Sequence, residues 1–137
     1  MNDRELGDLP ARTFRVRLQR LDQRRFAKRV GFVRIDAKGY ELAVLEGAAQ
    51  TLQAHRPAIL IEIGAANMSP LVELLRQFGY RGAFGFAGEY LPVEAFDEDH
   101  HQPAAALTML RKSSGAVPFV SNFLFTADVY ADGVRRR

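Results

Sequence analysis

The stretch FVRIDAKGYE, residues 32–41, decides how the rest of the chain is organised. Its apolar first half leads into Asp36, a turn follows at Gly39, and Glu41 opens a segment with helical spacing of apolar residues. This order predicts a strand, a tight turn and a helix. Asp36 would then lie at the carboxyl end of a strand, which is the edge of an open α/β sheet where ligands bind.

The residues that follow extend this unit into a strand–helix–strand pattern. Residues 41–54 carry the apolar stripe of a buried helix face, and Pro57 ends the helix because the residue before a proline avoids helical geometry. Residues 30–35 and 58–63 are nearly continuous apolar runs, typical of strands covered on both faces. We expect a right-handed parallel crossover between them.

Shorter patterns predict the remaining elements of one domain. Ser69 is suited to cap a helix over residues 70–78, and Gly79 is suited to end it in a left-handed conformation. Further strands are predicted at 13–21, 80–86 and 122–127, the last two as a hairpin, whereas 22–29 and 87–118 are irregular apart from a short helix at 104–111. The expected layout is a flexible lead-in at 1–11, a domain at 12–130 and a basic tail at 131–137.

The composition fits one globular domain and excludes several classes of protein. The chain has 137 residues, is 47% hydrophobic and 26% charged, and contains no cysteine, which rules out disulfides and thiolate metal sites. It has neither a secretory signal nor an apolar run of roughly 20 residues, so we expect a cytoplasmic protein with no membrane partner. Its net charge of +3 is not accompanied by a nucleic-acid-binding motif, so no nucleic-acid partner is expected.

Three carboxylates are the candidate functional residues. Asp36 either orients or deprotonates an acceptor hydroxyl, or caps the following helix. Glu41 either lines the same cleft or answers the helix dipole. Glu62 lies near the end of an apolar strand, where a carboxylate is costly unless it is paired or lies at a cleft. Lys38 is either a partner that neutralises Asp36 or a solvent-facing turn residue.

The two adjacent histidines do not predict a metal site. His100 and His101 follow an acidic run at 97–99, but neither zinc nor calcium-loop spacing is present. A solvated linker is the favoured interpretation of this stretch, and no metal is expected.

Residues 32–48, FVRIDAKGYELAVLEGA, resemble the signature of the FkbM family of S-adenosylmethionine-dependent methyltransferases. In that family a strand ending in Ile-Asp is followed by a Val-Glu-Gly turn and a leucine-rich helix with a Gly-Ala pair. The segments 18–22, 56–63 and 78–80 resemble the elements that flank the signature, so the resemblance spans about residues 16–80 in the family's order.

The resemblance implies a fold, a reaction and a cofactor. The fold is a class I methyltransferase fold, in which a Rossmann-like, mostly parallel α/β sheet with helices on both faces ends in an antiparallel hairpin. The reaction is methyl transfer from S-adenosylmethionine, typically to a hydroxyl oxygen of a small molecule or sugar. Asp36, Glu62 and Glu41 would then contribute the acceptor side.

Two departures from the family pattern leave two interpretations open. Gly7 is the only glycine before Gly31, so the glycine-rich cofactor turn has no counterpart, and we expect the C-terminal portion of the domain without its cofactor-binding half. Lys38 stands where the family has a glutamate. The chain is either a methyltransferase of the FkbM type or a non-catalytic remnant or split-subunit assembly module. An exposed apolar edge would invite a complementary chain or a second copy as partner.

Overall fold

The computed structural model describes residues 13–103 and 119–127, which form a five-stranded sheet in the order β1-β2-β5-β3-β4. The strands are β1 (Phe32–Ile35), β2 (Ala58–Glu62), β3 (Tyr80–Phe86), β4 (Glu89–Pro92) and β5 (Asn122–Ala127). Only β1 and β2 pair in parallel, and the other three adjacent pairs are antiparallel. The α/β class is confirmed, whereas the expectation of a mostly parallel sheet is wrong because β5 inserts between β2 and β3 in the opposite direction.

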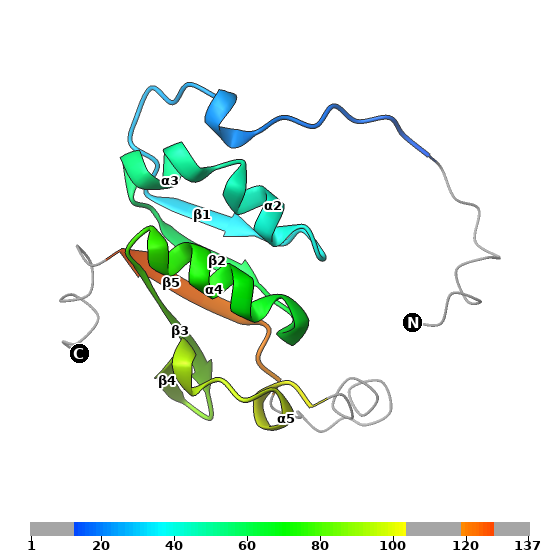
Figure 1. Ribbon diagram of the computed structural model, residues 1–137, viewed down its shortest axis with the longest axis vertical. Helices are drawn as coiled ribbons and strands as arrows, with labels where there is room; N and C mark the ends of the chain where they lie inside the picture. The colour runs from blue at the N-terminus through cyan, green and yellow to red at the C-terminus, as the bar shows by residue number, and fades with distance from the viewer. Residues whose placement is uncertain (1–12, 104–118, 128–137) are drawn as a thin grey trace.

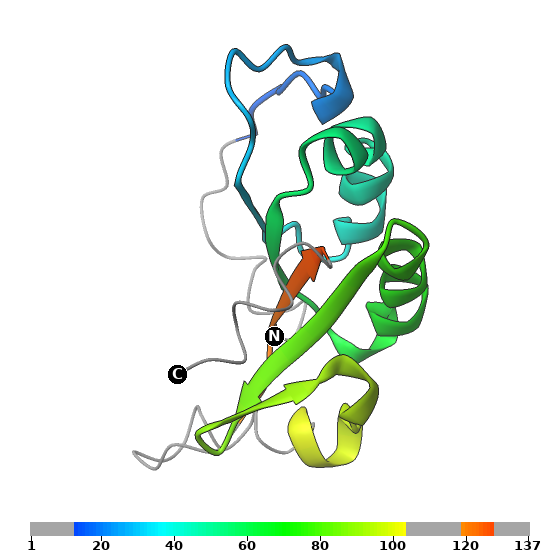
Figure 2. The ribbon, with the colours of Figure 1, turned by 90° about the vertical axis from the view of Figure 1, so that its left-hand side faces the viewer.

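Three helices cover one face of this sheet: α2 (Glu41–Glu46), α3 (Ala49–His55) and α4 (Met68–Gln77). Figures 1 and 2 show them on the same side, so the expected second helix layer is not formed by the described residues. The strand side chains that face the helices are buried, among them Ile59, Ile61, Phe123 and Phe125. Burial of these apolar side chains is the main force that holds the helices on the sheet.

The local apolar patterns located most elements correctly. The strands predicted at 58–63, 80–86 and 122–127 are β2, β3 and β5, and β5 pairs with β3 as expected. Gly79 has the predicted left-handed φ of 74°, just after α4. The predicted cap at Ser69 is wrong, since α4 begins one residue earlier and Asn67 precedes it without a side-chain cap.

The strand predicted at 13–21 is wrong. Residues 13–20 are exposed and pair with no described strand, and the chain then forms the 3-10 helix η1 (Leu21–Gln23). An alternating apolar pattern suits the side-chain arrangement of a strand. A strand also needs a neighbouring strand to bond its backbone N–H and C=O groups. We call residues 13–19 the arm. The arm extends from η1, which lies on the β1 side of the molecule (Figure 1).

The helix predicted over residues 41–54 is divided into α2 and α3 by a contact from outside the helix. In a continuous helix the Thr51 N–H would donate to the Gly47 carbonyl. Asp22 takes both positions, because its own N–H donates to Gly47 O at 3.0 Å and its Oδ1 accepts from Thr51 N at 2.8 Å.

The preceding helical hydrogen bond is replaced in the same way. Gln50 N donates to Asp22 Oδ2 at 3.1 Å, and Arg20 Nη2 donates to the Glu46 carbonyl at 2.9 Å. Ala48, at the start of α3, has no side-chain oxygen, so Asp22 acts as the helix cap from a distant part of the sequence. We call these contacts the Arg20–Asp22 cap.

The region after β3 is more ordered than the sequence predicts. A tight turn at Ala87 and Gly88, with φ of 51° and 86°, joins β3 to β4, and η3 (Val93–Ala95) and α5 (Glu98–His101) follow. His101 is buried against the rings of Phe84 and Phe86, so this stretch is not a solvated linker. The helix predicted at 104–111, the lead-in and the tail lie outside the described residues.

Replacing Asp22 with alanine should lower the free energy of unfolding by about 1 kcal/mol, because α3 loses its cap. Burial works to raise the pKa of Asp22, but the hydrogen bonds from Thr51 and Gln50 outweigh it and hold the pKa below its usual value of 3.8. The stabilisation is therefore present above that value and is lost as the pH falls through the folded pKa.

Urea unfolding of the unsubstituted protein and Asp22→Ala at neutral pH and at about pH 2 measures this effect, and the difference should shrink at the lower pH. Asp22→Asn is the matched control, since it keeps one carbonyl acceptor and should lose less. Equal stabilities at neutral pH would contradict the capping role.

Candidate functional site

A charged cluster lies where the two parallel strands end. The register pairs Ile35 with Ile61, so Asp36 and Glu62 follow at adjacent positions of the same sheet edge. Lys38 Nζ lies 3.0 Å from Asp36 Oδ1 and 2.6 Å from Glu62 Oε1. Two of the three predicted carboxylates are thus brought together, with Lys38 between them.

The turn after β1 sets the position of Lys38. Lys38 and Gly39 both have positive φ, 48° and 100°, and Tyr40 N donates to the Ala37 carbonyl at 3.3 Å. A lysine in this left-handed conformation is unusual, because its Cβ crowds the backbone there. The turn reverses the chain and brings the lysine side chain back to the strand ends.

Glu41, the third candidate, serves this turn and is not part of the cluster. Its carboxylate accepts from Gly39 N at 2.9 and 3.1 Å, and the residue is buried. Tyr40, not Asp36, occupies the position before α2, so Asp36 does not cap that helix. The structure therefore places Asp36 in the charged cluster and Glu41 beneath the turn.

The cluster remains open to solvent. The side chain of Lys38 is 72% exposed, and those of Asp36 and Glu62 are 32% and 33% exposed. The hydrogen bonds to Glu62 and then to Asp36 raise the pKa of Lys38, which keeps the ammonium charged. The solvent-facing ammonium can donate a hydrogen bond to a polar ligand, and the two carboxylates can accept hydrogen bonds from it.

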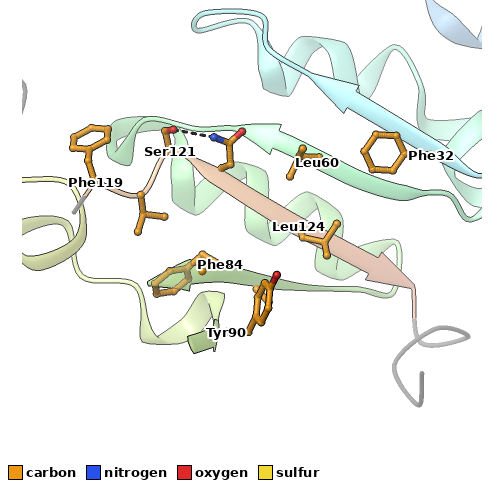
Figure 3. Close-up of a pocket in the computed structure, with 11 residues that line it drawn as sticks. Phe32, Leu60, Phe84, Tyr90, Phe119, Ser121 and Leu124 are labelled. Carbon is orange, nitrogen blue, oxygen red and sulfur yellow. Dashed lines mark hydrogen bonds between the residues drawn. The ribbon is translucent and has the colours of Figure 1, made fainter. Parts of the chain in front are cut away.

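A hollow of about 420 Å³ lies on the face of the sheet without helices, and no residue of the cluster lines it. Asn122, which lines it, is the β5 neighbour of Glu62. Figure 3 shows Leu60 and Leu124 along its apolar floor and Ser121 at its polar end. Its size and its mixed apolar and polar lining suit a small ligand. The sequence did not predict this hollow, because it depends on the position of β5 between β2 and β3.

A buried glutamine fixes the polar end of the hollow. Gln102 Nε2 donates to the carbonyls of Ile63 and Val120 at 2.7 and 2.6 Å, and its Oε1 accepts from Ala65 N at 2.9 Å. These three bonds attach the end of α5 to the end of β2 and to the start of β5. A side chain that satisfies three buried backbone groups makes the local geometry rigid.

The remaining candidates lie elsewhere in the described part of the chain. His101 Nδ1 is 2.9 Å from Asp97 N and 3.0 Å from Asp97 O, within the aromatic cluster that buries its ring. Among residues 13–103 and 119–127, no group of three or more His, Cys, Asp or Glu side chains is arranged to hold a metal ion. No helix described there is long and apolar enough to cross a membrane.

The pKa of Lys38 offers a direct test of the cluster. Because it is raised above the usual 10.5, we expect the ion pairs to persist below that value and to be lost as the pH rises through the folded pKa. Glu62→Gln should lower the pKa of Lys38 more than Asp36→Asn, since the hydrogen bond to Glu62 contributes more.

Side-chain ammonium signals in NMR spectra, recorded against pH for the folded protein and for the protein in urea, measure these values. A Lys38 pKa that is equal in both states would contradict the cluster.

Comparisons with known proteins give one family. The methyltransferase FkbM domain matches residues 2–81, which include β1, the turn at Lys38, β2 and α4, and the match ends at the start of β3. No curated protein and no solved structure matches the chain significantly. The family match covers more than half of the 137 residues. The chain therefore belongs to the FkbM methyltransferase domain family.

Proposed function

We propose that this chain contributes the acceptor side of an FkbM-type O-methyltransferase that acts on a small molecule or sugar hydroxyl. The observation that carries the proposal is the Asp36–Lys38–Glu62 cluster at the carboxyl ends of β1 and β2. Asn122, the β5 neighbour of Glu62, connects this edge to the hollow. The carboxylates accept hydrogen bonds from acceptor hydroxyls, and the Lys38 ammonium donates to an acceptor oxygen. The apolar floor of the hollow takes the carbon face of the acceptor.

The cluster is better suited to orienting an acceptor than to removing its proton. Lys38 already donates to both carboxylates, so neither is an isolated negative charge in a dry pocket. A hydroxyl held in one orientation against a methyl donor gains reactivity from positioning. In methyl transfer the acceptor oxygen would form the new O–CH₃ bond as the S–CH₃ bond of the sulfonium donor breaks, with that electron pair left on sulfur. The hydroxyl proton would pass to solvent, which reaches this open site.

The described residues do not fit the cofactor itself. S-adenosylmethionine supplies the methyl group in this family, and its sulfonium is a cation. The larger groove beside β1 is lined by Arg20, Arg24 and Arg34, which repel a cation, and its one carboxylate, Asp36, is already paired. Within residues 13–31, ahead of β1, the structure describes no glycine-rich turn that could approach a cofactor.

Acceptor binding can be tested by titrating the ¹⁵N-labelled protein with methyl glycosides and small polyols. We expect shifts of the Lys38, Gly39 and Asn122 amides, and Glu62→Gln should weaken binding about tenfold because a charged acceptor is lost.

Glu73→Gln is the matched control, since Glu73 is an exposed glutamate on α4, which packs on the opposite face of the sheet. Shifts confined to other parts of the sheet, or an equal loss in both variants, would contradict an acceptor site at the cluster.

The alternative function is a non-catalytic assembly module, and the open edge of β1 together with the exposed arm favours it. Calorimetric titration with S-adenosylmethionine tests whether the chain alone can act as a complete methyltransferase. We expect no micromolar binding by the chain alone, because the described residues lack a site for the cofactor. Micromolar binding would contradict the assembly-module alternative, whereas absence of heat at high concentration would contradict catalysis by the chain alone.

A further inference from the structure

The free edge of β1 is a template for another strand. Among the described strands β1 pairs only with β2, and Ala58 N donates to the Gly31 carbonyl at 3.0 Å. Because backbone groups alternate along a strand, Val33 and Ile35 also face β2, whereas the N–H and C=O groups of Phe32 and Arg34 face the open edge. Such an edge pairs readily with an extended chain.

A groove of about 990 Å³ runs along this edge. The side chains of Val33 and Ile35 line it on the β1 side, and Val44 and Tyr40 of the α2 region line it beside them. Leu18, at the base of the arm, lies on its opposite side. The groove therefore combines an apolar lining and an unpaired strand edge with the base of the arm, where Leu18 and Gln19 line it.

The arm is held away from β1, and its exposed side chains alternate between apolar and basic. Phe14, Val16 and Leu18 are 76%, 78% and 90% exposed and alternate with Arg15 and Arg17. The Arg20–Asp22 cap fixes the base of the arm to the α2–α3 junction. The separation leaves room between the arm and β1.

The positive charge around the groove favours an acidic ligand. Arg20, Arg24 and Arg34 line the groove, and Arg15 and Arg17 lie on the adjoining arm. The one carboxylate in the lining, Asp36, is already paired with Lys38 and Arg34. A second copy of the arm would add two more arginines, whereas acidic side chains would neutralise those present.

We propose that this groove binds an extended segment of another polypeptide in which apolar residues alternate with aspartate or glutamate, and that the segment adds to β1 as a sixth strand of the sheet. Its main chain pairs with the outward-facing groups of Phe32 and Arg34, which is the β-strand-addition mode of peptide recognition. Its apolar side chains cover Val33 and Ile35, and its carboxylates meet the arginines. This assignment stands independently of the methyl-transfer proposal.

The probe is a fluorescein-labelled synthetic peptide in which valine alternates with glutamate, followed by fluorescence anisotropy on the full chain. The matched probes replace each glutamate with lysine, or group the valines at one end. We expect the alternating glutamate peptide to bind at least about tenfold more tightly than either, and its affinity to fall as salt rises.

Substitutions in the arm separate the apolar contribution from the charged one without disturbing the core, because these side chains are exposed. Phe14→Ser, Val16→Ser and Leu18→Ser together, or Arg15→Ser and Arg17→Ser together, should each weaken binding about tenfold. The control combines Arg25→Ser and Lys28→Ser. These two exposed basic residues lie between η1 and β1 and do not line the groove, so binding should be unchanged.

Amide hydrogen exchange distinguishes strand addition from loose electrostatic attachment. Peptide binding should slow exchange at Phe32 and Arg34, while Val33 and Ile35, already paired with β2, change little. Equal binding of the lysine peptide, binding without protection of Phe32 and Arg34, or a dimer of the free chain that fills the groove with its own arm would each overturn the proposal.

Discussion

The division between α2 and α3 and the anchoring of the arm both depend on Asp22, which takes the place of two consecutive hydrogen bonds in a helix. Its carboxylate accepts the N–H groups of Gln50 and Thr51, and its own N–H satisfies the Gly47 carbonyl. Because these groups are satisfied by another segment, the chain can turn between α2 and α3 at little cost in hydrogen bonding. The same contacts fix the base of the arm to the α2–α3 junction.

This dependence explains which features the sequence predicts and which it does not. β2, β3 and β5 were located from local apolar patterns, since burial on one sheet face requires those residues whatever the rest of the chain does. The break at Gly47 was not predicted, because its cause is a residue 25 positions earlier that carries no local signal for a helix end. The alternating pattern at 13–21 gives these residues a strand propensity, but no described strand pairs with them, so they do not form a strand.

The sequence predicts only the part of the candidate site that follows from local patterns. Asp36 follows the first strand and Glu62 ends the second, so their meeting needed only the parallel crossover that the pattern implied. The sequence predicts Lys38 either as a partner of Asp36 or as a solvent-facing turn residue, and its bond to Glu62 depends on two consecutive positive φ angles. Asn122 and the hollow depend on β5 entering the sheet beside β2, and no short-range pattern reports the order of strands.

The insertion of β5 also explains why the cluster lies where it does. β1, β2 and β3 run in one direction, yet β5 separates β3 from the other two, so among the described strands only β1 and β2 present carboxyl ends side by side. A charged cluster needs two adjacent strand ends if one lysine is to bridge both carboxylates, and this sheet offers that arrangement once. The same strand β1 that carries Asp36 into the cluster forms the open edge. A strand added there would lie against Arg34, which is 3.6 Å from Asp36, so occupancy of the edge and the charge of the cluster are coupled through one arginine.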